Sequence, residues 1–146
     1  MDADIKRSII LDNYQDARNR GVPTNMDGYV KINSNNESCI DNIDIYVKLD
    51  NDVIEDIKFE GEACVIAISS TSILSDLLIG KKISEVDNIL KNYYSMIEEH
   101  EYDRELLGDC CVYDDIYKQP SRKTCVTLFA RGIEKVVNNS NKKNDI

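Results

Sequence analysis

Apolar residues near the start of the chain recur with the period of a helix. Four of them share one face of a 3.6-residue repeat: Ile5, Ile9, Ile10 and Tyr14. Gly21 and Pro23 follow, and both residue types interrupt helices. The pattern therefore predicts a helix over residues 3–20, followed by a polar turn.

The next part of the chain changes to the alternation of apolar and polar residues that is typical of half-buried strands. Residues 29–32 are a short candidate strand, and residues 33–39 are polar enough to predict a loop. Apolar residues then alternate over 43–49 and recur again over 53–59. Because Asp50-Asn51-Asp52 lies between these two segments, we expect them to form a hairpin.

The second half of the chain is dominated by helical patterns. Residues 63–79 and 83–99 carry apolar residues at helical spacing, and Gly80 is placed to end the first of these helices. Residues 100–120 have no clear period, and residues 121–137 indicate a closing helix. The order of elements predicts an α+β fold, in which a small antiparallel sheet of about three strands is covered by helices.

Length and composition indicate one globular domain. The chain has 146 residues, of which 42% are hydrophobic and 31% charged, enough to bury a substantial core. We expect this domain to span residues 1–137, since the polar segment 138–146 resembles a disordered tail.

Charge and hydropathy exclude several classes of partner. The net charge of −9 argues against binding of nucleic acid. No apolar run approaches the roughly 20 residues that a membrane-spanning helix needs, so we expect no membrane association. Residues 1–6 include two aspartates and precede no long apolar segment, which is unlike a secretory signal, and we expect a cytoplasmic protein.

The chain has five cysteines, an odd number that does not fit a closed framework of disulfides. Three of them lie at predicted element boundaries: Cys39 in the polar loop, Cys64 after the second hairpin strand, and Cys125 near the start of the closing helix. The helix N-termini near Cys64 and Cys125 would favour the thiolate form. Together with Asp41, these cysteines are a candidate metal site.

Residue types alone leave the identity of this site open. Three thiolates and one carboxylate suit a tetrahedral zinc ion, and sulfur-rich ligation also suits an iron–sulfur cluster. The three cysteines are 25 and 61 residues apart with no CxxC pair, and free cysteine often packs as a small hydrophobic residue. On the pattern alone, both a metal site and simple core packing are consistent with the sequence.

Four further residues have side chains that could serve a function. His100 lies in a run of glutamates, which favours a surface position, and the adjacent Cys110 and Cys111 are expected to be a partly buried pair rather than ligands. Arg122 is three residues before Cys125, where it could be an ordinary surface charge or could offset the negative charge of the ligands.

Several motifs together resemble the SufU branch of the IscU/NifU N-terminal scaffold-like proteins. They extend over roughly residues 5–137 and are Ile9-Ile10-Leu11-Asp12-Asn13-Tyr14, Arg18-Asn19-Arg20-Gly21, Cys39-Ile40-Asp41, Phe59-Glu60-Gly61-Glu62-Ala63-Cys64, Ser69-Ser70, Leu107-Gly108-Asp109 and Pro120-Ser121-Arg122-Lys123-Thr124-Cys125. The long interval between Cys64 and Cys125 resembles the SufU branch more than the shorter IscU branch.

The resemblance implies both a ligand set and an activity. It implies that Cys39, Asp41, Cys64 and Cys125 hold zinc, and that Cys39 accepts persulfide sulfur from a SufS-type cysteine desulfurase for iron–sulfur cluster assembly. The desulfurase would carry the pyridoxal phosphate, and downstream cluster-assembly proteins would receive the sulfur. The alternative is a scaffold that assembles a [2Fe-2S] cluster on the same ligands, and a purely structural zinc domain is a third possibility.

Two positions depart from the family pattern. Ile40 replaces the family's glycine between Cys39 and Asp41, where a bulky residue could crowd a docking partner. Thr124 stands where IscU proteins have a histidine ligand. The absence of that histidine favours the sulfur-transfer interpretation over the scaffold interpretation.

Overall fold

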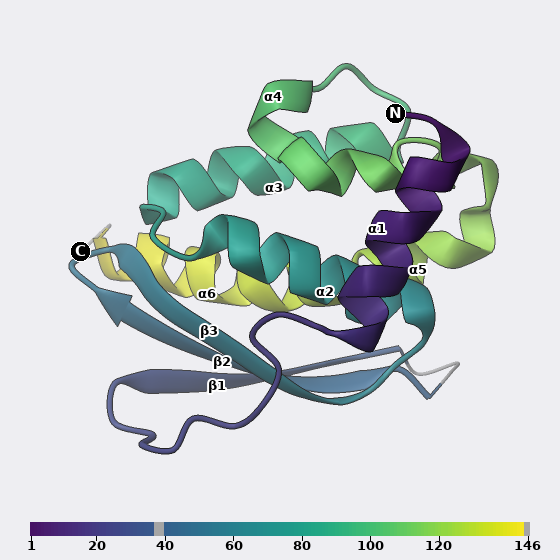
Figure 1. Cartoon of the computed structure of the whole chain (residues 1–146). Helices are drawn as coiled ribbons and strands as arrows, with labels where there is room; N and C mark the ends of the chain where they lie inside the picture. The colour runs from purple at the N-terminus through teal and green to yellow at the C-terminus, as the bar shows by residue number, and fades with distance from the viewer. Residues whose placement is uncertain (37–39, 145–146) are drawn as a thin grey trace.

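The computed structural model describes residues 1–36 and 40–144, with side chains through residue 140. One antiparallel sheet of three strands forms a layer, and the helices gather on one of its faces (Figure 1). This arrangement confirms the predicted α+β fold.

The sheet has the order β1-β2-β3, with β1 at Tyr29–Asn35, β2 at Asn42–Asp50 and β3 at Val53–Glu62. The predicted β2–β3 hairpin is confirmed, and Asn51 and Asp52 both have positive φ in its turn, as tight hairpins require. A β-bulge follows Lys48, where the partner of Leu49 shifts to Ile54. The bulge allows Ile54 and Ile57, three residues apart, to be fully buried on the same face.

The helical layer contains both long helices and short turns. Its long members are α1 (Ala3–Gln15), α2 (Val65–Leu78), α3 (Ile83–Ile97) and α6 (Leu128–Asn144). Its short members are α4 (Arg104–Leu107), α5 (Lys123–Val126) and the 3-10 turns η1 (Gly108–Tyr113), η2 (Ile116–Lys118) and η3 (Pro120–Arg122).

The predicted bounds are wrong at the first helix and the first strand. Helix α1 ends at Gln15, because the following residues bind elsewhere: the Arg18 amide donates to the Ser72 hydroxyl and the Asn19 side chain to Ser75. Strand β1 continues through Asn35, into residues expected to form a loop. It does so because Asn33, Ser34 and Asn35 all pair with the start of β2.

The closing helix also differs from the prediction. The expected helix over 121–137 is divided into η3, α5 and α6, and α6 continues to Asn144 through the segment expected to be a tail. Ser140 on this extension is buried and its hydroxyl lies 3.4 Å from the carboxylate of Asp52 at the β2–β3 turn. Contact with the sheet thus supports a helical extension that is polar in sequence. That residues 1–137 form one domain remains a prediction.

The segment between α1 and β1 fastens the free edge of β3 before it reaches the opposite edge of the sheet. The Gly21 amide donates to the Phe59 carbonyl at 2.7 Å, and the Phe59 amide donates to the Asn19 carbonyl at 3.0 Å. Residues 22–27 then pass the outward side chains of Lys48 and Lys58 and lead into β1 (Figure 1). Before this crossing, the bonds of Arg18 and Asn19 to Ser72 and Ser75 hold the end of α1 beside α2.

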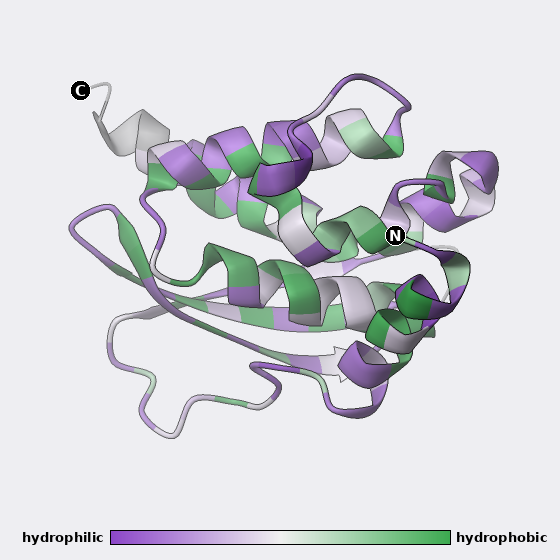
Figure 2. Cartoon of the chain, turned by 45° about the horizontal axis from the view of Figure 1, so that its top comes forward, coloured by the Kyte–Doolittle hydropathy of each residue, from purple (hydrophilic) through white to green (hydrophobic). Residues whose placement is uncertain are grey.

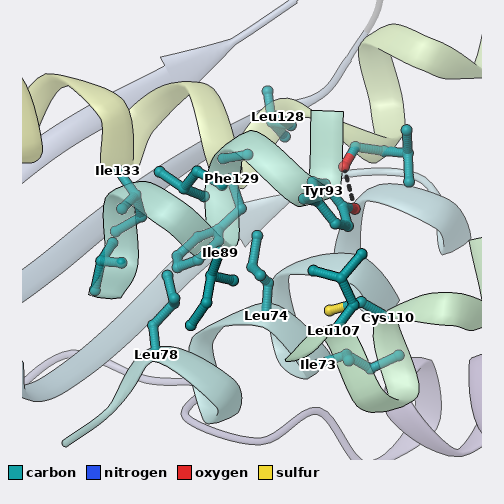
Figure 3. Close-up of a cluster of buried hydrophobic side chains, with 14 of the residues drawn as sticks. Ile73, Leu74, Leu78, Ile89, Tyr93, Leu107, Cys110, Leu128, Phe129 and Ile133 are labelled. Atoms are coloured by element: carbon teal, nitrogen blue, oxygen red, sulfur yellow. Dashed lines mark hydrogen bonds between the residues drawn. The ribbon is translucent and has the colours of Figure 1, made fainter. Parts of the chain in front are cut away.

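The core lies between the sheet and the helices. Hydrophobic residues gather where helices face the sheet and one another, while the connecting segments are largely hydrophilic (Figure 2). Side chains from α2, α3 and α6 interdigitate, and the Tyr93 hydroxyl donates to the Val126 carbonyl at 2.7 Å (Figure 3). Among the residues that the structure describes, no helix has both the length and the apolarity needed to cross a membrane.

Gly61 permits a close approach between the backbones of β2 and β3. Its φ of +141° is rarely adopted by other residues, and a Cβ atom there would lie 2.3 Å from the Asn42 carbonyl oxygen and 2.8 Å from the Ile43 Cα. Gly21 has a similar φ of +132°, but a Cβ atom there would meet nothing within 4 Å. A side chain at Gly21 would therefore cause backbone strain alone, whereas a side chain at Gly61 would cause both backbone strain and steric overlap.

We predict that Gly61→Ala destabilises the fold more than Gly21→Ala, as measured by urea denaturation. Gly21→Ala is expected to cost about 1–3 kcal/mol from backbone strain. Gly61→Ala adds overlap with the β2 backbone, which costs about 1–3 kcal/mol more. Equal losses for the two variants would contradict the steric role assigned to Gly61.

Candidate metal centre

The register between β2 and β3 places Asp41 beside Cys64. Asn42, at the start of β2, pairs with Glu62 at the end of β3. Asp41 comes just before this pair and Cys64 just after it, so residues 23 positions apart in sequence become neighbours. The Cys64 amide donates to Oδ1 of Asp41 at 2.9 Å.

Cys64 is the N-cap residue of α2, as its predicted place near a helix N-terminus required. Its Sγ atom accepts the Ala67 amide at 3.5 Å. The same Sγ atom lies 3.9 Å from Oδ2 of Asp41. The free amides at the helix start and the helix dipole both favour negative charge at this sulfur.

Cys125 approaches from the other end of the chain. It lies in the one-turn helix α5, not at the start of the long closing helix as expected, and it is buried. The bond from Tyr93 to the Val126 carbonyl holds α5 against the core. One donor atom each from Asp41, Cys64 and Cys125 lies within 4.8 Å of the others.

The electrostatics of this cluster suit a bound cation. Burial raises the pKa of the Cys125 thiol to about 12, and the adjoining Cys64 and Asp41 contribute to the rise. When neighbouring acidic groups oppose each other's ionisation, a divalent cation bound between them stabilises their anionic forms. Zinc takes tetrahedral ligands at about 2.3 Å for sulfur and 2.0–2.2 Å for oxygen, which places ligand atoms about 3.6–3.8 Å apart. The three donors, within 4.8 Å of one another, lie near that spacing.

Two residues that the sequence analysis did not identify, Asn36 and Arg131, lie beside the cluster. Asn36 is buried, and its Nδ2 donates to Oδ2 of Asp41 and to the Thr124 carbonyl, each at 3.2 Å. Nη2 of Arg131 donates to Oδ1 of Asn36 at 2.5 Å and to the same Thr124 carbonyl at 2.8 Å. In the sequence, the only sign of a role for Asn36 at the cluster is that it is close to Cys39. Arg131 is 95 residues from Asn36, so no sequence pattern points to its role.

The structure thus brings together three of the four predicted ligands. Cys39, the fourth, lies outside the described residues. Ile40 is 75% exposed beside the buried Asp41, and Thr124 is exposed with its carbonyl facing Asn36 and Arg131. Arg122, weighed as a charge-offsetting group, is exposed.

The remaining candidates lie away from the cluster. Cys110 and Cys111 are both buried in the core, as the buried-pair interpretation requires. Burial raises the pKa of Cys110 well above its usual range and also raises the pKa of Cys111. His100 is exposed, in agreement with its predicted surface position.

The chain resembles proteins named for sulfur transfer and for cluster assembly. It is 36% identical over 132 residues to the zinc-dependent sulfurtransferase SufU of Bacillus subtilis, covering 90% of this chain and 88% of that protein. It is 32% identical over 116 residues to the iron–sulfur cluster assembly scaffold protein IscU of Streptococcus pyogenes, covering 79% and 73% of the two chains.

A solved structure shares the same fold. The protein from Fervidobacterium islandicum named as a cluster assembly scaffold for the SUF system superposes with a TM-score of 0.77 at 28% identity, covering 86% of this chain and 91% of that one. Residues 5–126 match the family described as the NifU-like N terminal domain, a range that contains all three described donors. Because the family model matches residues 5–126 and a relative that is 36% identical covers 90% of the sequence, the chain belongs to the NifU-like N terminal domain family.

Proposed function

We propose that this protein is a zinc-dependent sulfurtransferase that accepts persulfide sulfur for iron–sulfur cluster assembly. The observation that carries the proposal is the cluster of Asp41, Cys64 and Cys125, whose donor atoms lie within 4.8 Å of one another. Similarity over 90% of the chain to a protein named as a zinc-dependent sulfurtransferase supports it.

In this proposal the zinc ligands are Cys39, Asp41, Cys64 and Cys125. When bound, zinc keeps its cysteine ligands as thiolates at neutral pH. Cys64 and Cys125 are the anchored members, since one caps α2 and the other lies in α5 against the core. Cys39 completes the set, because it is two residues before Asp41.

Cys39 is the proposed sulfur acceptor. Its thiolate attacks the outer sulfur of a persulfide on the partner, a new S–S bond forms at Cys39, and the partner's cysteine leaves as a thiolate. Electrons balance without an external oxidant, because the transferred sulfur keeps its oxidation state. Cys64 and Cys125 stay in packed elements, which keeps the fold intact during transfer.

The proposed donor of sulfur is a SufS-type cysteine desulfurase, which would itself carry the pyridoxal phosphate. The proposed recipients are downstream cluster-assembly proteins. A partner that approaches the cluster meets the exposed side chains of Ile40 and Val65, which flank Asp41 and Cys64. These apolar side chains give a docking protein surface to bury at the site.

A second candidate function is a scaffold that assembles a [2Fe-2S] cluster on the same ligands. Sulfur-rich ligation and the similarity to proteins named as IscU scaffolds favour it. Position 124, next to Cys125, is a threonine, and its side chain has no nitrogen atom that could act as a metal ligand. We therefore rank sulfur transfer first.

We predict that the purified protein holds one zinc per chain, contains little iron and is colourless. Cys64→Ala or Cys125→Ala should remove the zinc and lower the melting temperature, since binding of structural zinc adds to folding stability. Metal analysis by mass spectrometry measures the zinc content. The matched control is Cys110→Ala, which removes a buried thiol from the core and should keep the zinc. Zinc retained in both ligand variants, or a brown iron-containing protein, would contradict the assignment.

We predict that Cys39 carries the persulfide. Incubation with a cysteine desulfurase and cysteine should add about 32 mass units at Cys39, as persulfide exchange requires, and peptide mass spectrometry locates the added sulfur. Cys39→Ala should stay folded and lose stimulation of the desulfurase. The controls are Cys110→Ala and Cys111→Ala, whose thiols are buried away from the cluster. Sulfur found on Cys110 or Cys111, with Cys39→Ala still active, would refute the mechanism.

A further inference from the structure

Asn36 joins three parts of the chain at the metal cluster. It follows the end of β1, where the Ser34 hydroxyl donates to the Leu128 carbonyl at 2.7 Å and fastens the strand to the start of α6. The Asn36 amide then donates to the Asp41 carbonyl at 3.0 Å. The Asn36 side chain is 8% exposed, so its hydrogen bonds form away from bulk solvent.

Arg131 fixes which end of the Asn36 amide group faces Asp41. An arginine side chain can only donate hydrogen bonds, so the group 2.5 Å from its Nη2 must be the amide oxygen of Asn36. The amide nitrogen of Asn36 then faces the Asp41 carboxylate and the Thr124 carbonyl, which are both acceptors. Each hydrogen bond that links Arg131 through Asn36 to Asp41 therefore joins a donor to an acceptor.

The same geometry holds both carboxylate oxygens of Asp41. Oδ1 accepts the Cys64 amide at 2.9 Å and Oδ2 accepts Nδ2 of Asn36 at 3.2 Å. Arg131 polarises the Asn36 amide and strengthens it as a donor. Arg131 thus acts on the Asp41 carboxylate through the neutral amide group of Asn36.

We infer that Asn36 and Arg131 are positioning residues that set the orientation of the Asp41 carboxylate as a metal ligand. The inference rests on the proposed zinc site and adds to it a second layer of contacts. Outer contacts of this kind typically change metal affinity by about 10–100-fold. The inferred role acts through the Asp41 carboxylate, whereas the bonds of both side chains to the Thr124 carbonyl support the backbone beside Cys125.

The test measures the affinity of the whole chain for Zn²⁺ by competition with a chelating indicator. Asn36→Ala should weaken zinc binding by about 10–100-fold. Asn36→Asp has the same shape and keeps an acceptor for Arg131, but it places an oxygen against Asp41, so it should weaken binding at least as much. Arg131→Lys keeps the charge but loses the bond from Nε to the Thr127 hydroxyl that orients the side chain, and a smaller loss is expected.

The Asp41→Ala background separates positioning from support of the fold. If Asn36 acts through Asp41, Asn36→Ala in that background should change zinc affinity by no more than about threefold, because the coupled partner is gone. In the Co²⁺-loaded protein, the visible absorption bands of Asn36→Ala should shift toward those of Asp41→Ala. The matched control is Asn35→Ala, an exposed neighbour whose side chain donates to Asn33, and it should keep wild-type affinity.

The outcomes are distinct. Equal losses of zinc affinity with and without Asp41 would overturn the positioning role, and so would wild-type affinity in both Asn36 variants. Either result would leave the proposed function standing if the wild-type chain binds one zinc and stimulates the desulfurase. A wild-type chain that binds no zinc would refute the proposed function and this inference together.

Discussion

The pairing between the start of β2 and the end of β3 determines where the donors of the metal cluster lie. Asp41 and Cys64 flank the pair of Asn42 and Glu62, so their separation follows directly from the register. A slip of two residues would move Asp41 by about 7 Å along β3, more than the 4.8 Å that now contains the three donors. Gly61 secures this register, because only its lack of a side chain lets the two backbones approach so closely.

The other elements fix the remaining donor and the surroundings of the cluster. Cys64 is the N-cap of helix α2, so the packing of that buried helix also holds a sulfur ligand in place. Helix α5 supplies Cys125 and is fastened by the buried hydroxyl of Tyr93. Asn36, which follows β1, contacts the Asp41 carboxylate and is itself held by Arg131 of α6. Each donor is therefore attached to an element whose stability comes from packing or strand pairing elsewhere in the fold.

Local patterns predicted the hairpin and the helical segments well, because alternation and helical period are encoded by near neighbours in sequence. The same patterns placed Cys64 and Cys125 near element boundaries and made them, with Asp41, a candidate metal site, but sequence spacing could not show that the three residues lie together in space. Asn36 and Arg131 were missed, since their roles depend on contacts across 95 residues. The extension of β1 through Asn35 was missed for a similar reason: its polar residues are held in a strand by pairing with β2.

The segment after α1 also limits how this sheet can grow. Backbone bonds from Asn19 and Gly21 to Phe59, with Nη2 of Arg20 donating to the Gly61 carbonyl at 2.7 Å, occupy the outer edge of β3 next to the cluster. Strand addition by another chain is therefore blocked on the side where the ligands lie. In the described part of the sheet, the opposite edge at β1 carries the exposed Lys31, and a lysine on an edge strand discourages edge-to-edge aggregation. The connection that positions α1 thus also protects a small sheet from pairing between molecules.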